Sequence, residues 1–364
     1  MRMLLRFILA ASLALLPPGL VAAPALAKLA ITASVTAAAE RENDRITLRW
    51  AGLTGPVQVY LLPNADASAR AGKLLTAAAN AENAVVDVPA GSRPYFLLRD
   101  KRGLEVRVAE RLLPLVGGSN FRDLGGYRGA GGRPVRWGRL YRSAVMSGLT
   151  PADFTTLSQL GIRTVCDFRA NGERARDVVN WPVGGSPKIL TRDYELDIKP
   201  MMAVFAGGSA PTPEQARGAM AGFYRELPFQ FAGQFKEMFA ELLAGRAPLA
   251  FNCSAGKDRT GMAAVLILLA LGVDREVAVA DFLLSNRYYK PAAPRPGERP
   301  DPTMAMFARL PPGVAQAFMG VDRSYIEAAL AELDRRGGAD RYFASELGLG
   351  PAERMRLQSL YLQG

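Results

Sequence analysis

The sequence predicts an α/β protein with a central, mainly parallel sheet flanked by helices and preceded by a small β-sandwich-like domain. Two observations predict this fold class. Short β-rich runs separated by Gly, Pro and Asn turns fill residues 28–115, and strands alternate with helices over residues 116–364. The pattern changes near Gly117 and Gly118. With 364 residues, 49% of them hydrophobic, the chain is long enough for one large domain or two ordinary ones.

Residues 28–115 are predicted to form the β-sandwich. The β-rich runs are 46–50, 57–62, 84–88, 95–98 and 104–108, with a turn at 100–103. A helix-prone run over 65–81 does not fit this pattern. No cluster of nucleophilic side chains is found here, so we expect either a recognition or scaffolding role or a contribution to solubility.

In residues 116–364 both strands and helices are predicted. Thr150 followed by Pro151 and Asp153 is typical of a capped helix start, and Gly161 ends that helix. The proline-rich segment 291–302 is predicted to be a loop or lid. The strands are 140–143, 162–168, 188–194 and 248–252; the helices are 150–160, 213–243 with an interruption at Pro228, 260–271, 274–289 and 323–336.

Residues 1–27 have the pattern of a secretory signal peptide. Arg2 and Arg6 precede an apolar run over 7–16, and the A-x-A sequence at 25–27 fits a cleavage site. A membrane anchor is the alternative, but the run is about half the roughly twenty residues that a span needs. We therefore expect export to the periplasm or the medium, with cleavage after Ala27 or Ala23.

Composition excludes several kinds of chemistry. The chain has no histidine and only two cysteines, so a Ser-His-Asp triad, a Cys-His pair and a His-ligated or all-cysteine zinc site are impossible. The net charge of +11 favours anionic partners. Nucleic acid is not expected, because no basic run is interleaved with aromatic residues; contact with a membrane surface is a further expectation.

The residues that carry chemistry lie at 251–261, which read Phe-Asn-Cys-Ser-Ala-Gly-Lys-Asp-Arg-Thr-Gly. A strand is predicted to enter this segment and a helix to leave it, so backbone N–H groups and the helix N-terminus would form an anion site. Cys253 lies where thiols ionise easily. Arg259 follows six residues later and can bind two phosphoryl oxygens as a planar fork. The pattern indicates a thiol nucleophile that faces phosphorus.

Other interpretations of this segment are weaker. A nucleotide-binding P-loop is excluded, because Asp258 stands where Ser or Thr is required and Phe251 where glycine is required. The other cysteine, Cys166, has Gly172 at the sixth position and lacks the motif. An ordinary buried cysteine at position 253 is the remaining alternative.

The sequence resembles the atypical bacterial protein tyrosine phosphatases, whose loop reads H-C-x-x-G-K-D-R-T-G. Every fixed position from Cys253 to Gly261 matches, and the resemblance covers about residues 116–364. Further motifs of that family match at 120–127 (Asn-Phe-Arg-Asp-Leu-Gly-Gly-Tyr), 140–144 (Leu-Tyr-Arg-Ser-Ala), 167–169 (Asp-Phe-Arg) with Glu173, and 319–327.

The resemblance implies a cysteine-phosphatase fold and a role for each loop residue. Cys253 would form a cysteinyl-phosphate intermediate, Arg259 would bind phosphate and stabilise the transition state, and Thr260 would donate to the sulfur. No metal or other cofactor is expected, because the loop and Arg259 supply the positive charge. The phosphate would be surrounded by Ser254, Ala255, Gly256 and Lys257.

The general acid implied by the resemblance is Asp258, which would protonate the leaving oxygen and then deprotonate water. A separate acid loop is not expected, because Trp-Pro at 181–182 is followed by Val183 rather than an acid. Asp167 and Asp123 are fallback candidates. A structural cap is the alternative role for Asp258.

Three further positions leave alternatives open. Asn252 replaces the family's histidine and can never carry charge, so slower chemistry or a higher pH optimum is expected. Lys257 would either hold a second phosphate, as in phosphoinositides, or be solvated. Cys166 would either form a reversible disulfide with Cys253 or be an ordinary buried cysteine.

We therefore expect a phosphatase that hydrolyses phosphate monoesters, with phosphotyrosine as the default substrate and phosphoserine or phosphothreonine as further ones. A phosphoinositide phosphatase is one alternative. A catalytically weak, phosphate-recognising binding module is the other, and it is motivated by Asn252 and by the additional β-rich region, whose partner the sequence leaves unassigned.

Overall fold

The computed structural model describes residues 35–78, 82–89, 91–182, 184–207, 210–291, 302–307 and 309–364. The expected signal peptide at 1–27, Val183 and most of the proline-rich segment 291–302 lie outside these residues. In the part that is described, no helix is both long enough and apolar enough to cross a membrane.

Two antiparallel sheets form the β-sandwich that the sequence predicts. One sheet has the strand order β1-β2-β5 and the other β4-β3-β6-β7. The strands are β1 (Thr36–Glu42), β2 (Arg45–Ala51), β3 (Val57–Leu62), β4 (Lys73–Ala78), β5 (Asn83–Asp87), β6 (Tyr95–Arg99) and β7 (Glu105–Ala109).

Alternation of buried and exposed residues along these strands builds the core of the sandwich. Ile46, Leu48 and Trp50 are buried along β2, and they share one hydrophobic cluster with Val59 and Phe96 of the opposite sheet. The helix-prone run at 65–81 contains only a short 3-10 turn, η1 (Ala69–Ala71), before strand β4. Strand β1 was not predicted, because its sequence TAAAERE contains few residues with high β-propensity.

The second sheet is mainly parallel and has the order β11-β10-β12-β9-β8. Its four parallel strands pair through β10 and β12 at the centre, and only β8 is antiparallel. This confirms the predicted sheet. Its strands are β8 (Arg122–Asp123), β9 (Leu140–Ser143), β10 (Thr164–Asp167), β11 (Lys188–Thr191) and β12 (Leu249–Asn252).

Helices cover both faces of this sheet. The helices are α1 (Pro151–Gln159), α2 (Asn171–Arg176), α3 (Lys199–Met202), α4 (Pro213–Gln230), α5 (Ala232–Leu243), α6 (Arg259–Ala270), α7 (Arg275–Leu283), α8 (Ser285–Tyr288), α9 (Pro302–Phe307), α10 (Pro312–Met319), α11 (Arg323–Arg335), α12 (Gly338–Ser345) and α13 (Pro351–Tyr361); η2 (Ala130–Gly132) and η3 (Ala203–Phe205) are short 3-10 turns.

Local sequence explains several helix boundaries. The Thr150 hydroxyl accepts from the N–H of Asp153, whose carboxylate accepts from the N–H of Thr150, as the predicted capping box requires. The expected interruption of the 213–243 helix falls at Phe231, between α4 and α5, rather than at Pro228, which lies inside α4. The expected 274–289 helix is divided into α7 and α8.

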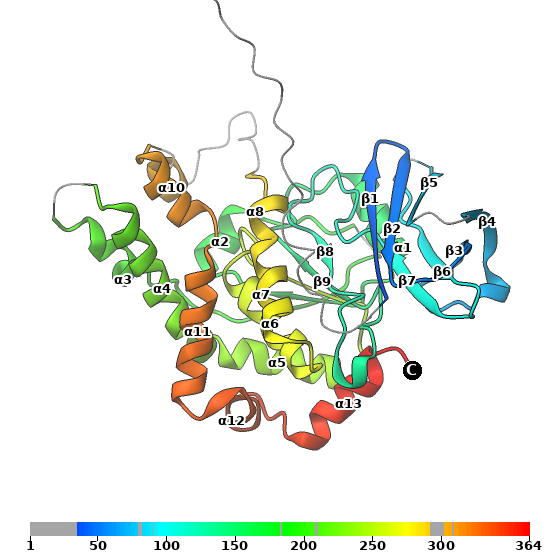
Figure 1. Ribbon diagram of the computed structural model, residues 1–364. Helices are drawn as coiled ribbons and strands as arrows, with labels where there is room; N and C mark the ends of the chain where they lie inside the picture. The colour runs from blue at the N-terminus through cyan, green and yellow to red at the C-terminus, as the bar shows by residue number, and fades with distance from the viewer. Residues whose placement is uncertain are drawn as a thin grey trace, which may run out of the picture.

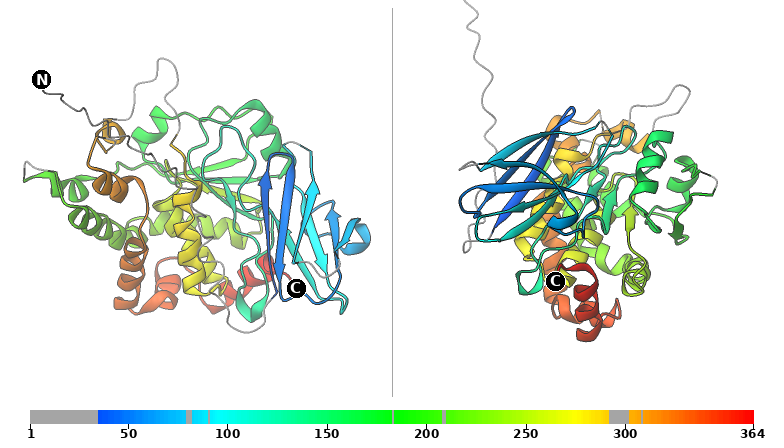
Figure 2. Two further views of the ribbon diagram at one scale, coloured as in Figure 1. Left: turned by 45° about the horizontal axis from the view of Figure 1, so that its top comes forward. Right: turned by 90° about the vertical axis from the view of Figure 1, so that its right-hand side faces the viewer.

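The sandwich lies at one end of the molecule, and α3, α4, α10 and α11 lie at the other, with the mainly parallel sheet between them (Figures 1 and 2). Side chains on one face of the sheet, such as Phe251, share the large core cluster with α4, α5 and α6. Side chains on the other face, such as Val165 and Ala250, pack with Leu157 of α1. Helix α6 is apolar on almost all sides and is almost entirely buried.

A buried ion pair joins the sandwich to the mainly parallel sheet. Arg93 Nη2 lies 2.6 Å from Asp123 Oδ2, and the two side chains are 2% and 0% exposed. Nearby, Trp137 Nε1 donates to the carbonyl of Arg107 at 3.1 Å. These contacts attach the sandwich to the sheet through groups that are largely shielded from water.

Candidate active site

The loop at residues 253–258, called the phosphate loop below, connects the central strand β12 to α6. Ends of neighbouring strands surround it, because β9 and β10 run parallel to β12 and finish at the same edge of the sheet. Ligand sites in open α/β sheets lie at these carboxyl ends. The structure therefore places the predicted loop where such a site is expected.

Three successive carbonyl groups of the phosphate loop are held by donors outside it. The N–H of Val145 donates to the Ser254 carbonyl at 3.0 Å. Asn120 Nδ2 donates to the Ala255 carbonyl at 3.3 Å and to the Gly256 carbonyl at 2.9 Å. In a trans peptide the N–H points opposite to the carbonyl, so the N–H groups of residues 255–257 face the other way, into the loop.

Within the part of the chain that the structure describes, these inward N–H groups have no protein acceptor. Among the described residues, no hydrogen bond uses the backbone N–H of residues 254–258 as donor. A concave row of free N–H groups at the N-terminus of a helix is a binding site for an anion such as phosphate.

A buried polar cluster supports the loop from below. Arg142 Nη2 also donates to the Gly256 carbonyl at 2.8 Å, while its Nη1 donates to Asp281 Oδ2 at 2.8 Å. Arg122 lies 3.4 Å from the same carboxylate oxygen, and it donates to the side-chain oxygen of Asn120. Burial alone would raise the pKa of Asp281, but Arg122 and Arg142 outweigh it and lower this pKa to about 2. The two arginines and one aspartate leave a net positive charge beneath the loop.

Arg259 is oriented by Glu173 of α2. Its Nη1 and Nη2 atoms lie 2.6 Å and 2.8 Å from the two carboxylate oxygens, and Nη1 also lies 2.7 Å from the Tyr194 hydroxyl. Guanidinium carries five N–H groups in a fixed plane. Because Glu173 occupies the end formed by Nη1 and Nη2, the edge formed by Nε and Nη2 is left for two phosphoryl oxygens.

Glu173 is itself held as an ionised group. Its Oε1 accepts from the Ser254 hydroxyl at 2.5 Å and its Oε2 from the N–H of Ala170 at 2.7 Å. Burial favours a higher pKa for Glu173, but the hydrogen bond and charge of Arg259 outweigh it and lower this pKa to about 2. The same pairing raises the pKa of Arg259 above its usual range, although burial opposes it.

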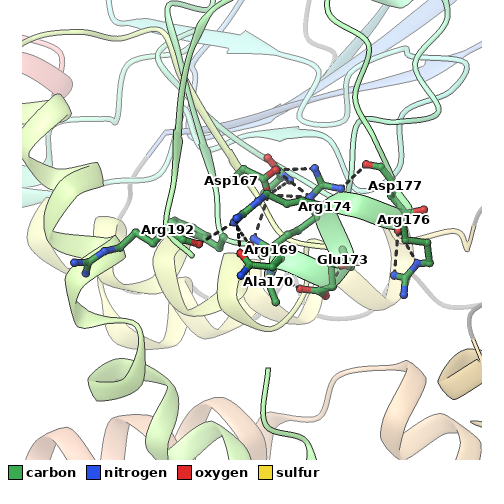
Figure 3. A network of polar contacts seen from close by, with 12 residues as sticks. Asp167, Arg169, Ala170, Glu173, Arg174, Arg176, Asp177 and Arg192 are labelled. Carbon is green, nitrogen blue, oxygen red and sulfur yellow. Dashed lines mark hydrogen bonds and ion pairs between the residues drawn. The ribbon is translucent and has the colours of Figure 1, made fainter. Parts of the chain in front are cut away.

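Helix α2 is fastened to its surroundings by the polar network in Figure 3. Arg174 Nη1 donates to the carbonyls of Arg169 and Arg192, and its Nη2 donates to Asp193 at 2.6 Å. These bonds hold α2 against the end of β11, so the position of Glu173 is set by two strand ends rather than by α2 alone.

Asp258, the expected general acid, has one oxygen engaged and one free. The Tyr224 hydroxyl of α4 donates to Asp258 Oδ1 at 2.6 Å, and Lys257 Nζ lies 3.9 Å from the same oxygen. Among the described residues, no hydrogen bond involves Asp258 Oδ2. The Asp258 side chain is 17% exposed, so it can reach a bound ligand.

The two fallback acids are engaged elsewhere. Asp167 receives hydrogen bonds from the side chain of Arg169 at 2.7 to 3.0 Å and from Asn252 Nδ2 at 3.1 Å. Asp123 is bound by Arg93 and by the N–H groups of Gly125 and Gly138. Both carboxylates are therefore bound to structural partners, whereas Asp258 is the acidic residue that lies in the loop itself.

Lys257 is turned away from the expected phosphate position. Its Nζ donates to the carbonyls of Phe318 and Gly320 at 2.5 Å and 3.0 Å, at the C-terminal end of α10. Binding of a second phosphate would have to draw Lys257 away from these carbonyls. In the structure the residue connects the phosphate loop to α10.

Cys253 is fully buried at the start of the loop, and Thr260 Oγ1 is a buried hydroxyl that lacks a hydrogen-bond partner among the described residues. Cys253 and Cys166 are both free thiols. Cys166 pairs in register with Phe251, two residues before Cys253, so strand geometry separates the two cysteine Cα atoms by about 8 Å. A disulfide rarely spans more than about 7 Å, so the disulfide alternative would require the backbone to move.

Several residues of this site were not assigned a role from the sequence. Asn120, Arg142 and Glu173 lie in motifs that match the family, but the motifs do not indicate what each side chain contacts. Tyr224 and Asp281 carry no local signal, because nothing near either residue in the sequence distinguishes it from the other polar residues of its helix.

Comparison with known proteins identifies similar sequences over the region that contains this loop. A family model described as "Tyrosine phosphatase family" matches residues 113–363, which include the phosphate loop and exclude the seven strands of the sandwich.

Two relatives cover most of the same region. A Cupriavidus necator protein named as a tyrosine-protein phosphatase is 34% identical over 255 residues, which is 68% of this chain and 86% of that protein. Triple specificity protein phosphatase PtpB of Mycobacterium tuberculosis is 31% identical over 286 residues, 70% of this chain and 100% of that protein.

A solved structure, P. aeruginosa TpbA in complex with pTyr, has 16% sequence identity and a TM-score of 0.27, covering 58% of this chain and 88% of that chain.

Proposed function

This chain belongs to the tyrosine phosphatase family and is a phosphatase, and from that premise we propose that it hydrolyses phosphotyrosine through a cysteinyl-phosphate on Cys253. Phosphoserine and phosphothreonine are further substrates of the same chemistry. The observation that carries the proposal is the orientation of the phosphate loop, whose carbonyls are bound by outside donors while its N–H groups remain available.

In the first step the Cys253 thiolate attacks phosphorus, and the bond from phosphorus to the leaving oxygen breaks. Asp258 gives its proton to that oxygen, so the leaving group departs as a neutral alcohol or phenol. The inward N–H groups and the Nε–Nη2 edge of Arg259 bind the three equatorial oxygens, where charge develops.

In the second step water attacks the phosphorus of the intermediate and the bond between sulfur and phosphorus breaks. Asp258, now ionised, takes the proton from water, so it ends the cycle in its starting form. Thr260, whose hydroxyl is buried and unpaired, is suited to donate to the departing sulfur.

Phosphoinositides are the alternative substrate class. The name of the relative PtpB, a triple specificity protein phosphatase, is compatible with more than one class. Against this alternative, Lys257 is occupied by two carbonyl groups in this structure, so it does not form a preformed second phosphate site.

The test is phosphate release by the purified protein from a phosphotyrosine peptide and from a phosphatidylinositol monophosphate, measured side by side. The variant Cys253→Ser should lower release by at least about a thousandfold, because oxygen cannot replace the thiolate nucleophile at neutral pH. Acid-quenched reactions with radiolabelled substrate should contain labelled protein in the wild type only.

The matched control is Cys166→Ser, which removes the other buried thiol of the chain. It should retain activity in proportion to the folded fraction. Equal activity of wild type and Cys253→Ser would contradict the mechanism. Faster phosphate release from the lipid than from the peptide would show that the phosphoinositide, rather than phosphotyrosine, is the preferred substrate.

We also propose that this activity is exported, on the basis of the signal-peptide pattern at residues 1–27. Mass spectrometry of the protein recovered from a Gram-negative periplasm should then find a new N-terminus at Lys28. Recovery of the full-length chain from the cytoplasm would contradict export.

A further inference from the structure

We propose that Tyr224 is a positioning residue for the general acid, which fixes the Asp258 carboxyl so that its proton is carried on Oδ2 and directed to the leaving group. This inference rests on the proposed role of Asp258. It adds a residue of α4, far from the loop in sequence, to the machinery of the reaction.

The hydrogen-bond pattern at Asp258 supports this assignment. A carboxylic acid carries its proton on one oxygen only, and an oxygen that already accepts a short hydrogen bond is the poorer site for it. Tyr224 donates to Oδ1 at 2.6 Å, and the ammonium of Lys257 lies 3.9 Å from the same atom. The hydrogen bond from Tyr224 and the nearby positive charge of Lys257 both favour Oδ1 as the acceptor, so the acid form is protonated on Oδ2.

Tyr224 is itself rigid. It is fully buried, and its ring packs against Phe282 with centroids 5.7 Å apart and against Tyr325 at 5.4 Å. Such contacts leave the side chain one orientation, with the hydroxyl directed at Asp258. Most buried hydroxyls in proteins are hydrogen-bonded, and the partner of the Tyr224 hydroxyl is the Asp258 carboxyl.

Tyr224 also keeps its own proton. Burial, and after it the charge of Asp258, raises the pKa of Tyr224 well above the usual value for a tyrosine. The residue therefore remains a donor at every pH at which a phosphatase assay is run, and it does not compete with Asp258 as the acid.

General-acid catalysis predicts how the loss of Tyr224 should be detected. A leaving group that is a weak acid requires a proton in the transition state, whereas a leaving group that is a stronger acid departs without one. The rate kcat/KM reports formation of the cysteinyl-phosphate and therefore includes this proton transfer, even if hydrolysis of the intermediate limits kcat.

The test compares kcat/KM of the wild type and Tyr224→Phe across aryl phosphates that run from dinitrophenyl phosphate to phenyl phosphate. For phenyl phosphate we expect a loss of about tenfold to a hundredfold, which is part of the roughly hundredfold to ten-thousandfold that a general acid contributes. For dinitrophenyl phosphate we expect a change of about threefold or less. The dependence of log kcat/KM on leaving-group acidity should therefore become steeper in Tyr224→Phe.

Two further variants separate the possible failures. Asp258→Asn removes the acid and should produce the steepest dependence of all. Tyr361→Phe is the matched control, because Tyr361 is another buried tyrosine whose hydroxyl donates to a carbonyl, that of Leu242, at 2.7 Å, and it lies on α13. It should lose comparable stability and leave the dependence unchanged.

A uniform loss across all substrates in Tyr224→Phe would overturn the inference, since a purely structural role lowers every rate equally. If the dependence on leaving-group acidity is no steeper in Asp258→Asn than in the wild type, the assignment of Asp258 as the acid is refuted. If Asp258→Asn is steeper than wild type and Tyr224→Phe is not, the acid assignment stands and the role of Tyr224 is refuted.

Discussion

At Gly256 the backbone conformation and the available space both exclude a side chain. Its φ is +66°, a region that is strained for other residues, and a Cβ would lie 2.4 Å from the Ser143 carbonyl oxygen and 2.5 Å from the N–H of Ala144. The phosphate loop can therefore close against the end of β9 only with glycine at this position.

We predict that Gly256→Ala weakens competitive inhibition by inorganic phosphate by at least about tenfold, because the clash displaces the inward N–H groups. Inhibition constants measured with an aryl phosphate substrate test this. The matched control is Gly161→Ala, which has nearly the same φ of +65° but no atom within 4 Å of the added Cβ. It should lower stability by about 1 to 2 kcal/mol and leave phosphate binding intact; equal inhibition constants in the two variants would refute the explanation by clash.

At the scale of one element, α2 acts through Glu173. The pKa of this carboxyl is about 2 in the folded protein, against an ordinary value of 4.5. A carboxyl with a lowered pKa stabilises the fold fully above its unfolded-state pKa, and this contribution is lost as the pH falls toward the folded-state pKa. The affected window therefore lies between about pH 4.5 and pH 2.

We predict that the free energy of unfolding of Glu173→Gln changes less with pH across this window than that of the wild type. The difference between the two proteins should fall by about 3 kcal/mol from the upper to the lower end, since each pKa unit corresponds to about 1.4 kcal/mol. Urea unfolding at a series of pH values measures it. A difference that stays constant with pH would show that Glu173 is not held as an ion pair with Arg259.

At the scale of the whole molecule, the ion pair between Arg93 and Asp123 connects two parts that have separate cores. Removing one partner of a buried pair leaves the other charge without compensation. The family match begins at residue 113, so Arg93 comes from the sandwich side of that boundary while Asp123 comes from the phosphatase side.

We predict that Arg93→Met lowers the free energy of unfolding by about 3 to 5 kcal/mol, as measured by urea denaturation. The control is Arg45→Met, because the pair of Arg45 with Asp87 is exposed, with side chains 66% and 86% accessible. That change should cost less than about 1 kcal/mol. Similar losses of unfolding free energy in the two variants would mean that the buried pair of Arg93 and Asp123 does little to attach the sandwich.

Most elements could be predicted from local sequence, because each depends on near neighbours. The alternation of Ile46, Leu48 and Trp50 indicated a strand, and Thr150 with Asp153 indicated a helix start. Strand β1 lacks such a pattern, since it is rich in alanine and is held by its pairing with β2. Local propensity was overruled in the same way at 73–78, where pairing with β3 makes a strand.

Part of the candidate active site could be predicted from the sequence. The loop of Cys253, Asp258 and Arg259 is contiguous, so its spacing and its position between a strand and a helix are enough to predict the chemistry. Lys257 shows the limit of that reasoning: its side chain binds Phe318 and Gly320, about sixty residues later in the chain, and nothing near Lys257 in the sequence indicates this.

The sequence by itself predicted the fold class, from β-rich runs and the alternation of strands and helices along the chain. It also predicted an anion-binding loop and the thiol that faces it, because these follow from residue types within eleven consecutive positions. Only the tertiary structure decided which groups orient that loop: Asn120 and Arg142 at its carbonyls, Glu173 at Arg259 and Tyr224 at Asp258. Each of these contacts joins residues that are 34 to 136 positions apart. A hydrogen bond depends on distance and direction in space, and the chain specifies these only when the whole core has packed.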